Sequence, residues 1–331
     1  MTKKIELLAI GDTVVDAFIR LSQAEETYSA DHKTRQICMT FGDKIPFDFA
    51  TVLPAVGNSA NAAVSLARLG FESYLLSNVG DDSYGKECIE HLKGDKVHTD
   101  FVKVNAGKKT NYHYVLWFHN ERTILIKHEE YDYEFPKMEK PQWIYLSSLS
   151  KTSLPFHKKI EEYLIANPDV NVAFQPGTFQ ISLGTEALAG IYKNTNIFFC
   201  NVEEAEKILK SAGEVKEQMK KLAALGPKIV VVTDGPNGSY AYDSESGKAW
   251  FMPLYPDPKE PYERTGAGDA FGSTFTAAIM RGKGIPEAMA WASINSMSVV
   301  QYVGAQEGLL SEVRLLEYMK SAPKEFVAKE I

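Results

Sequence analysis

The sequence predicts an α/β fold with a mostly parallel central sheet that helices cover on both faces. Short apolar segments typical of buried strands alternate with segments typical of helices over most of the 331 residues. The strand segments are apolar throughout, as in sheets buried on both faces, rather than alternately polar and apolar. No internal repeat or Pro/Ser-rich linker interrupts this alternation. We therefore expect a single domain that spans residues 1–331.

The first predicted strand, 5–10, ends at Gly11-Asp12. A helix begins at Gly57-Asn58-Ser59, which provides an N-cap signal, and ends at Gly70, which has the residue type favoured just after a helix. The same reasoning predicts further strands at 71–79, 143–146, 170–174, 197–200 and 229–233. It predicts further helices at 83–92, 155–165, 202–211, 268–281, 286–302 and 311–321.

Two segments break the strand–helix alternation. Residues 35–56 are rich in β-branched and aromatic side chains without a helical period. Residues 112–118 and 122–128 are typical of two strands around a turn at His119-Asn120-Glu121. We expect these extra strands to project from the sandwich as a lid, with segments at about 17–55 and 101–130.

Composition and charge exclude several classes of protein. Apolar residues form 44% of the chain and charged residues 24%, which is ordinary for a folded soluble protein. Lys and Arg number 36 against 43 Asp and Glu, which argues against a nucleic-acid or membrane-surface partner but not against a small phosphorylated ligand. Three well-separated cysteines without a CxxC pair predict reduced thiols. No leader-like or membrane-spanning apolar run appears, so a cytoplasmic protein is expected.

The segment from Glu263 to Phe271 carries the clearest chemical signal. Gly266, Ala267 and Gly268 precede a predicted helix, so small side chains leave the free backbone N–H groups of its first turn open to an anion. Asp269 would repel a bound phosphate, unless its carboxylate takes a proton from an attacking hydroxyl while the backbone holds the transferred group. The alternative is a glycine-rich turn with Asp269 as a helix cap.

The string Gly266-Ala267-Gly268-Asp269 resembles the signature of the phosphofructokinase-B (PfkB)/ribokinase family of carbohydrate kinases. Five further segments resemble motifs of that family, in the same order, over about 300 residues. They are Gly11-Asp12-Thr13-Val14-Val15-Asp16, Val56-Gly57-Asn58-Ser59-Ala60-Asn61, Gly80-Asp81-Asp82-x-x-Gly85, Asn201-Val202-Glu203-Glu204 and Thr233-Asp234-Gly235-Pro236-Asn237-Gly238.

The resemblance implies a ribokinase-like three-layer sandwich with a small β-strand lid. It implies an ATP-dependent kinase that phosphorylates a primary hydroxyl of a sugar, with Asp269 as the base. The anion hole for the γ-phosphoryl group would be made by Gly266, Ala267 and Gly268. Positioning and charge stabilisation supply most of the catalysis in such a reaction.

The resemblance also implies the binding residues. Sugar contacts would come from Asp12, Asp16, Gly57, Asn58 and Asn61. Nucleotide contacts would come from Asn201, Thr233, Gly235, Gly238 and Asn295. Glu204 would act at the Mg²⁺ site, mostly through water; the alternative for Asn201 and Glu204 is a helix-capping pair.

Some positions depart from the family pattern. Val56 replaces the first glycine of the sugar motif. Glu263-Arg264 stands where many members have Asp-Thr. In those members the loop of that aspartate helps to hold a monovalent cation. Because the aspartate is replaced here, the resemblance does not imply that this chain depends on such a cation. Arg264 either places a positive charge near the phosphates or forms a surface ion pair. The segment 174–177 lacks the Asp-x-Asn-x-Arg pattern of some members.

Three rival functions remain at this point. The same fold accepts nucleosides, and Phe18, Phe41, Tyr112 or Trp117 would then line a slot for the base, although the polar cluster around Asp16 favours a sugar. A ligand sensor that kept the fold is a second rival. A Rossmann-type oxidoreductase is a third, but the first strand lacks the dinucleotide fingerprint. Apolar lid residues also suggest a homodimer, through Tyr112, Tyr114, Leu116 and Phe118.

Overall fold

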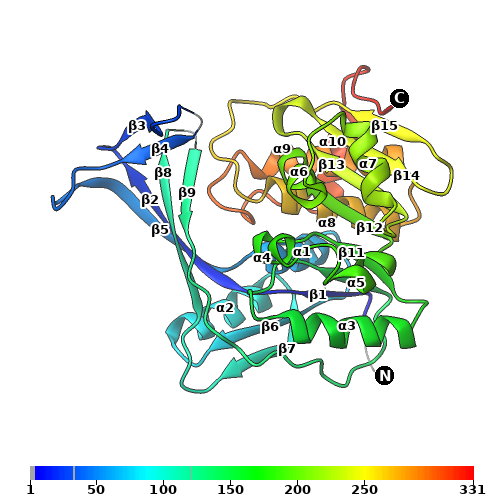
Figure 1. The fold of residues 1–331 in the computed structure, drawn as a ribbon, viewed down its shortest axis with the longest axis horizontal. Coiled ribbons are helices and arrows are strands. Elements are labelled where there is room, and N and C mark those ends of the chain that lie inside the picture. The colour runs from blue at the N-terminus through cyan, green and yellow to red at the C-terminus, as the bar shows by residue number, and fades with distance from the viewer. Residues whose placement is uncertain (1–3, 33, 120) are drawn as a thin grey trace.

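The computed structural model describes residues 4–32, 34–119 and 121–331, and its main body is a ten-stranded sheet with helices around it (Figure 1). In the spatial order given next, each of the first seven strands pairs in parallel with its neighbour, and the last three pair antiparallel. In spatial order they are β7 (His98–Asn105), β6 (Ser73–Gly80), β1 (Leu7–Ile10), β10 (Trp143–Leu146), β11 (Asn171–Phe174), β12 (Ile197–Asn201), β13 (Ile229–Thr233), β14 (Ser239–Asp243), β15 (Ala249–Met252) and β16 (Lys329–Glu330).

Each face of this sheet is buried beneath a helical layer. In β1, Leu7 and Ala9 belong to one hydrophobic core, and Leu8 and Ile10 belong to the other. The first layer contains α1 (Asn58–Arg68), α2 (Ser83–Gly94), α8 (Ala267–Met280), α9 (Ile285–Val299) and α10 (Glu312–Lys320). The second contains α3 (Leu154–Ala166), α4 (Thr178–Leu183), α5 (Ala189–Lys193), α6 (Val202–Leu209) and α7 (Val215–Ala223). Burial on both sides explains the continuous apolar strands, so this prediction is confirmed.

A second sheet projects from the sandwich, and we call it the lid (Figure 1). Its strands, in spatial order, are β5 (Phe47–Val56), β2 (Val14–Leu21), β8 (Asn111–Phe118) and β9 (Glu121–Leu125). A hairpin of β3 (Glu25–Tyr28) and β4 (Arg35–Cys38) accompanies it. The lid therefore provides the extra strands that the sequence predicts.

The boundaries of the lid differ from the prediction. The lid begins at Val14, not at about residue 17. Residues 101–105 belong to the main sheet, because Phe101 to Asn105 pair in parallel with Leu76 to Gly80. Strand β9 ends at Leu125 rather than at residue 128. The predicted turn residue Asn120 lies outside the described residues. Residues 1–3, in the segment where the sequence predicts no leader, also lie outside them.

The architecture brings distant segments together beneath the lid. Residues that follow β1, β10 and β11 and the last residues of β12 and β13 line one cavity together with the first residues of α1 and α8. The carboxyl ends of parallel strands share one edge of a sheet, which is where α/β folds commonly bind ligands. Among the helices of the described residues, none is both long and apolar enough to cross a membrane.

Candidate active site

Two cavities adjoin at the N-terminus of α8. The larger has a volume of about 360 Å³ and lies beneath the lid, and the smaller has a volume of about 290 Å³. Both are lined by Thr233, Arg264, Gly268 and Phe271. The predicted residues in the larger cavity are Asp12, Asp16, Gly57, Asn58, Asn61, Asn201, Glu204, Gly266 and Asp269. Those in the smaller cavity are Gly235, Gly238 and Ala267.

The junction of the cavities is built to receive an anion. Gly266 precedes α8 with a φ of +79°, and an added Cβ would lie 2.3 Å from the Cβ of Ala305. Only glycine fits this conformation and this close approach. The first-turn N–H groups of a helix have no intrahelical partner, and the helix dipole favours negative charge there. The hydroxyl of Thr265 is also buried and has no hydrogen-bond partner among residues 4–32, 34–119 and 121–331, so this loop offers several donors to a phosphate.

Asp269 lies buried in the first turn of α8, and three carboxamides donate hydrogen bonds to its carboxylate. Asn58 Nδ2 donates to Oδ1 at 2.7 Å, Gln175 Nε2 donates to Oδ1 at 3.0 Å, and Asn61 Nδ2 donates to Oδ2 at 2.7 Å. Burial raises the pKa of Asp269, and the three donors oppose that rise by stabilising the ionised form. The result is a fixed carboxylate suited to accept a proton.

Other side chains hold these carboxamides in place. Tyr145 Oη donates to Gln175 Oε1, and Gln306 Nε2 donates to Asn61 Oδ1 at 2.9 Å. Each contact occupies the amide oxygen, so the amide nitrogen faces Asp269. Asn58 and Asn61 were predicted as sugar contacts. They do line the cavity, but in this structure their nitrogens bind the candidate base.

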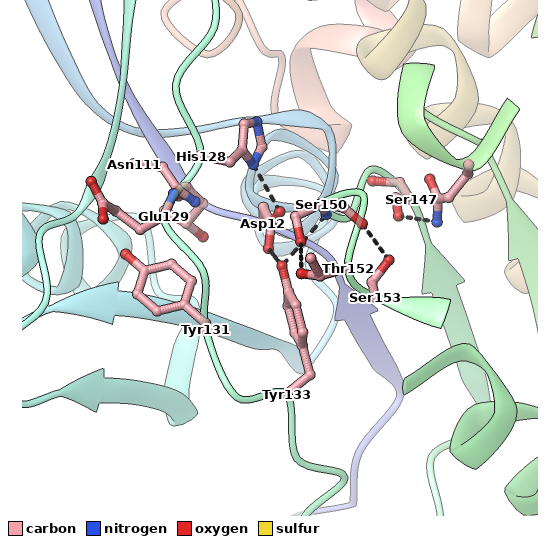
Figure 2. Close-up of polar contacts among 12 residues, drawn as sticks. Asp12, Asn111, His128, Glu129, Tyr131, Tyr133, Ser147, Ser150, Thr152 and Ser153 are labelled. Carbon is pink, nitrogen blue, oxygen red and sulfur yellow. Dashed lines mark hydrogen bonds and ion pairs between the residues drawn. The ribbon is translucent and has the colours of Figure 1, made fainter. Parts of the chain in front are cut away.

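Asp12, another predicted sugar contact, is also engaged by protein groups. Figure 2 shows its carboxylate between His128 and Tyr133. His128 Nδ1 lies 3.0 Å from Oδ2, and Tyr133 Oη donates to Oδ1 at 2.7 Å. Burial raises the pKa of Tyr133, so the phenol keeps its proton and remains a donor. Asp12 therefore positions the ring of His128, which lines the cavity.

Asp16 differs from Asp12 because one of its oxygens lacks a hydrogen bond. The side chain is buried, and Oδ1 has no hydrogen-bond partner among the described residues, although His113 Nδ1 lies 3.3 Å away in an ion-pair contact. A buried carboxylate oxygen without a donor is costly, and a substrate hydroxyl removes that cost. Asp16 is therefore the residue best placed to receive a hydroxyl group.

The smaller cavity is mainly apolar. Pro236, Leu254, Met297 and Val300 line it beside the glycine-rich loop after β13, which contains the short 3₁₀ helix η1 (Gly235–Asn237). An apolar slot next to a glycine-rich loop suits a flat base with attached phosphates. This cavity is the candidate nucleotide site.

Asn295 does not reach this cavity, contrary to the prediction. It is fully buried; its Nδ2 donates to Thr274 Oγ1 at 2.7 Å, and its Oδ1 accepts from the N–H of Leu310 at 2.9 Å. Helical periodicity turns it toward α8, while Ser296 and Met297 on the same helix line the cavity. Asn295 therefore joins α9 to its neighbours.

Asn201 and Glu204 form a capping box at the start of α6. Asn201 Oδ1 accepts from the N–H of Glu204 at 2.8 Å, and Glu204 Oε2 accepts from the N–H of Asn201 at 2.9 Å. Both residues also line the larger cavity, and burial raises the pKa of Glu204. Within the described residues no three His, Cys, Asp or Glu side chains cluster to hold a metal. The pair fits a cation held mainly by phosphates and water.

Several side chains at the cavity were missed as contacts in the sequence, and four of them carry hydrogen-bonding groups that the later argument uses. Gln175 was noted only as a departure from a motif, whereas His113, Arg122 and His128 come from the lid segment. The alternation of Arg122 with Ile124 and Ile126 signals one face of a strand. Periodicity alone does not tell which face meets the cavity.

The junction between the cavities defines the class of the protein. A nucleotide in the apolar cavity would present its terminal phosphate at the N-terminus of α8, beside a buried carboxylate and a polar cavity. This arrangement is that of an enzyme that transfers a phosphoryl group to a small-molecule alcohol.

The chain belongs to the pfkB family of carbohydrate kinases, whose family model matches residues 48–312. It is 27% identical to a ribokinase of Bacillus subtilis strain 168 over 261 residues, which are 76% of this chain and 83% of the ribokinase. An Arabidopsis thaliana ribokinase solved with ribose and ATP superposes with a TM-score of 0.77, at 20% identity, over 96% of this chain and 99% of that one. A nucleoside kinase of Methanocaldococcus jannaschii superposes with a TM-score of 0.75 at 20% identity and the same coverage. These two likenesses establish a ribokinase-like fold.

Proposed function

We propose that this protein transfers the γ-phosphoryl group of ATP to a primary hydroxyl of a sugar, in the cytoplasm and with Mg²⁺. The observation that carries the proposal is the meeting of an apolar and a polar cavity at the N-terminus of α8. Asp269 stands at this junction, on the side of the polar cavity. Membership of the carbohydrate kinase family supports the same reaction.

The geometry suggests how this chain performs the reaction. Asp16 holds the sugar through hydroxyl groups, and Asp269 accepts the proton of the hydroxyl that attacks the γ-phosphorus. The bond between that phosphorus and the oxygen bridging to the β-phosphate breaks, and ADP leaves. The first turn of α8 and the Thr265 hydroxyl hold the charge on the transferred group.

Mg²⁺ would neutralise charge on the β- and γ-phosphates. Asn201 and Glu204 would hold its water ligands at the cavity wall. Glu263 takes a different part: its buried carboxylate accepts from the N–H of Thr265 at 2.6 Å and from the N–H of Gly304 at 2.7 Å. Since both oxygens are engaged with the backbone, we propose a kinase that works without a monovalent cation at this residue.

A sugar suits the larger cavity better than a nucleoside. The carboxylates of Asp12 and Asp16 and the amides of Asn58, Asn61 and Gln175 converge on it, and a sugar presents many hydroxyls to such groups. A nucleoside is the second candidate, because Ile124, Ile126 and Phe179 line the same cavity and offer an apolar surface to a base. The nucleoside kinase with the same fold supports that alternative.

A substrate panel decides between the two. ADP release is measured with ATP and Mg²⁺ and, one at a time, ribose, fructose, 2-keto-3-deoxygluconate and adenosine. We expect turnover with at least one sugar. Strong turnover of adenosine, with all sugars inactive, would replace the proposal by the nucleoside alternative. ATP binding without turnover of any acceptor would instead favour a ligand sensor.

We also propose that a second copy pairs with the outer face of the lid. Val52, Tyr114 and Leu125 lie in one row across β5, β8 and β9, joined through Ala17 of β2. These three apolar side chains are 44%, 49% and 52% exposed. A row of exposed apolar side chains on a sheet is typical of an interaction surface.

A further inference from the structure

The inner face of the lid carries one arginine into the larger cavity. Along β9, Arg122 and Ile124 line the cavity, whereas Thr123 between them does not. The alternation follows from the pleat of a strand. Of the lid residues described at this cavity, Arg122 is the one with a permanent positive charge.

The guanidinium of Arg122 has an unused donor. Its Nε is buried and has no hydrogen-bond partner among the described residues. Glu26 of the neighbouring hairpin forms an ion pair with Arg35 instead. A buried N–H of a charged group without an acceptor is costly. A ligand with an acceptor oxygen close to Arg122 would satisfy this donor.

The register of the lid places that acceptor near the α8 loop rather than near Asp16. Arg122 pairs with Trp117, and Trp117 pairs with Arg20, so these residues form one row. The Trp117 ring lies 5.1 Å from that of Tyr262, which directly precedes the loop 263–266. Asp16 lies four residues from Arg20 along β2, which is about 13 Å at about 3.3 Å per residue.

The electrostatics agree with this placement. The positive charge of Arg122 acts on Asp269 and works against the burial that raises the pKa of that carboxyl. Arg122 thus stands above the side of the cavity where the base and the anion site meet.

We propose that Arg122 is a further catalytic residue, which donates hydrogen bonds to the oxygens of the phosphoryl group during its transfer. This role rests on the proposed kinase function. The acceptor hydroxyl forms a bond to the γ-phosphorus, the bond to the leaving oxygen of ADP breaks, and the hydroxyl proton goes to Asp269. Arg122 keeps its own proton and stabilises the negative charge on the oxygens. The planar fork of a guanidinium matches such oxygens.

Arg122→Met tests the proposal, because methionine keeps an unbranched apolar chain without the charge. We expect kcat to fall about 10²–10³-fold, as for the loss of one oxyanion donor, and the acceptor KM to change less than about twofold. Arg122→Lys keeps the charge without the fork and should recover part of kcat. Guanidinium ion should restore part of the activity of Arg122→Ala. Arg35→Met, on the exposed hairpin, is the matched control and should keep wild-type kinetics.

Binding provides a second measurement. ADP with aluminium fluoride and the acceptor imitates the transferring group, and Arg122→Met should weaken its binding by a factor similar to the loss in kcat. Binding of ADP alone should be unchanged, which also verifies the fold. If Arg122→Met does not fold, Arg122→Lys carries both measurements.

The outcomes separate the alternatives. An unchanged kcat with an acceptor KM raised tenfold or more would overturn the proposal and make Arg122 a contact of the acceptor. An unchanged kcat and KM would make it a structural lid residue. Absence of wild-type turnover with every acceptor would count against the proposed function, whereas normal wild-type turnover with an unaffected variant counts against Arg122 alone.

Discussion

The carboxylate of Asp269 in the sandwich and the polar side chains of the lid line the same cavity but differ in how they are hydrogen-bonded. On the side of the sandwich, Asp269 accepts three hydrogen bonds from carboxamides, and two of these, Asn61 and Gln175, are themselves held by neighbours. On the side of the lid, Asp16 Oδ1, His113 Nε2 and Arg122 Nε are buried and have no hydrogen-bond partner within the part of the chain that the structure describes. The proposed base is therefore organised before substrate arrives, which is where preorganisation aids catalysis most. A bound ligand would supply hydrogen-bond partners for these lid groups.

The largest expected effect comes from removing the base. Asp269→Asn keeps the size of the side chain but loses the proton acceptor, so kcat should fall about 10²–10⁴-fold. ATP affinity should stay the same or improve, because a negative charge beside the phosphates is gone. Steady-state kinetics and nucleotide titration measure both. Asp243→Asn, at the end of β14 and outside the lining of both cavities, is the control. Near-normal turnover of Asp269→Asn would reduce Asp269 to a structural residue of α8.

The next effect concerns the lid side of the comparison. Asp16→Asn replaces a buried carboxylate whose Oδ1 awaits a donor, and we expect the acceptor KM to rise about 10–100-fold, as for loss of a hydrogen bond to a charged group. The KM for ATP should hardly change, because Asp16 does not line the nucleotide cavity. The reverse pattern, with a raised KM for ATP alone, would place the acceptor elsewhere.

The pH dependence of activity tests how the hydrogen-bond donors around Asp269 affect its pKa. Burial raises the pKa of Asp269, and the base works when ionised, so activity is present above this pKa and is lost as pH falls through it. Gln175→Leu removes one donor to the ionised carboxylate, which raises the pKa further. The acid limb of kcat/KM should move to higher pH by about one unit.

Tyr145→Phe tests the same hydrogen-bond chain with a milder change than Gln175→Leu. It leaves Gln175 in place but removes the hydroxyl that orients its amide, so the acid limb should move in the same direction by a smaller amount. A limb that stays in place or moves to lower pH in both variants would show that this clamp does not tune the base.

The smallest effect on catalysis is expected on the outer face of the lid. Tyr114→Lys places a charge in the exposed row with Val52 and Leu125 and should convert a dimer into a monomer. Because the side chain points away from the cavity residues, kcat should change less than about twofold. Light scattering after size exclusion measures the mass, and a monomeric wild-type protein would contradict the pairing.

Much of the fold could be predicted from the sequence because its signals are local. Apolar strands, capping residues and glycines at helix starts act within a few positions, so the strand–helix order, the lid strands and the anion loop before Asp269 were all visible. Family membership confirms the class of enzyme. The roles of the individual site residues stay predictions, and the geometry is consistent with most of them.

The tertiary structure alone decided which partners and which cavity each of these side chains meets. Asp12 is engaged by His128, 116 positions away, and Asn58 and Asn61 meet Asp269 more than 200 positions away. Asn295 turned toward α8 rather than the nucleotide cavity, and Arg122 turned inward, because packing selects which face of a helix or strand is buried. Sequence motifs specify which groups are available, but a hydrogen bond between remote segments depends on how the layers and the lid come together.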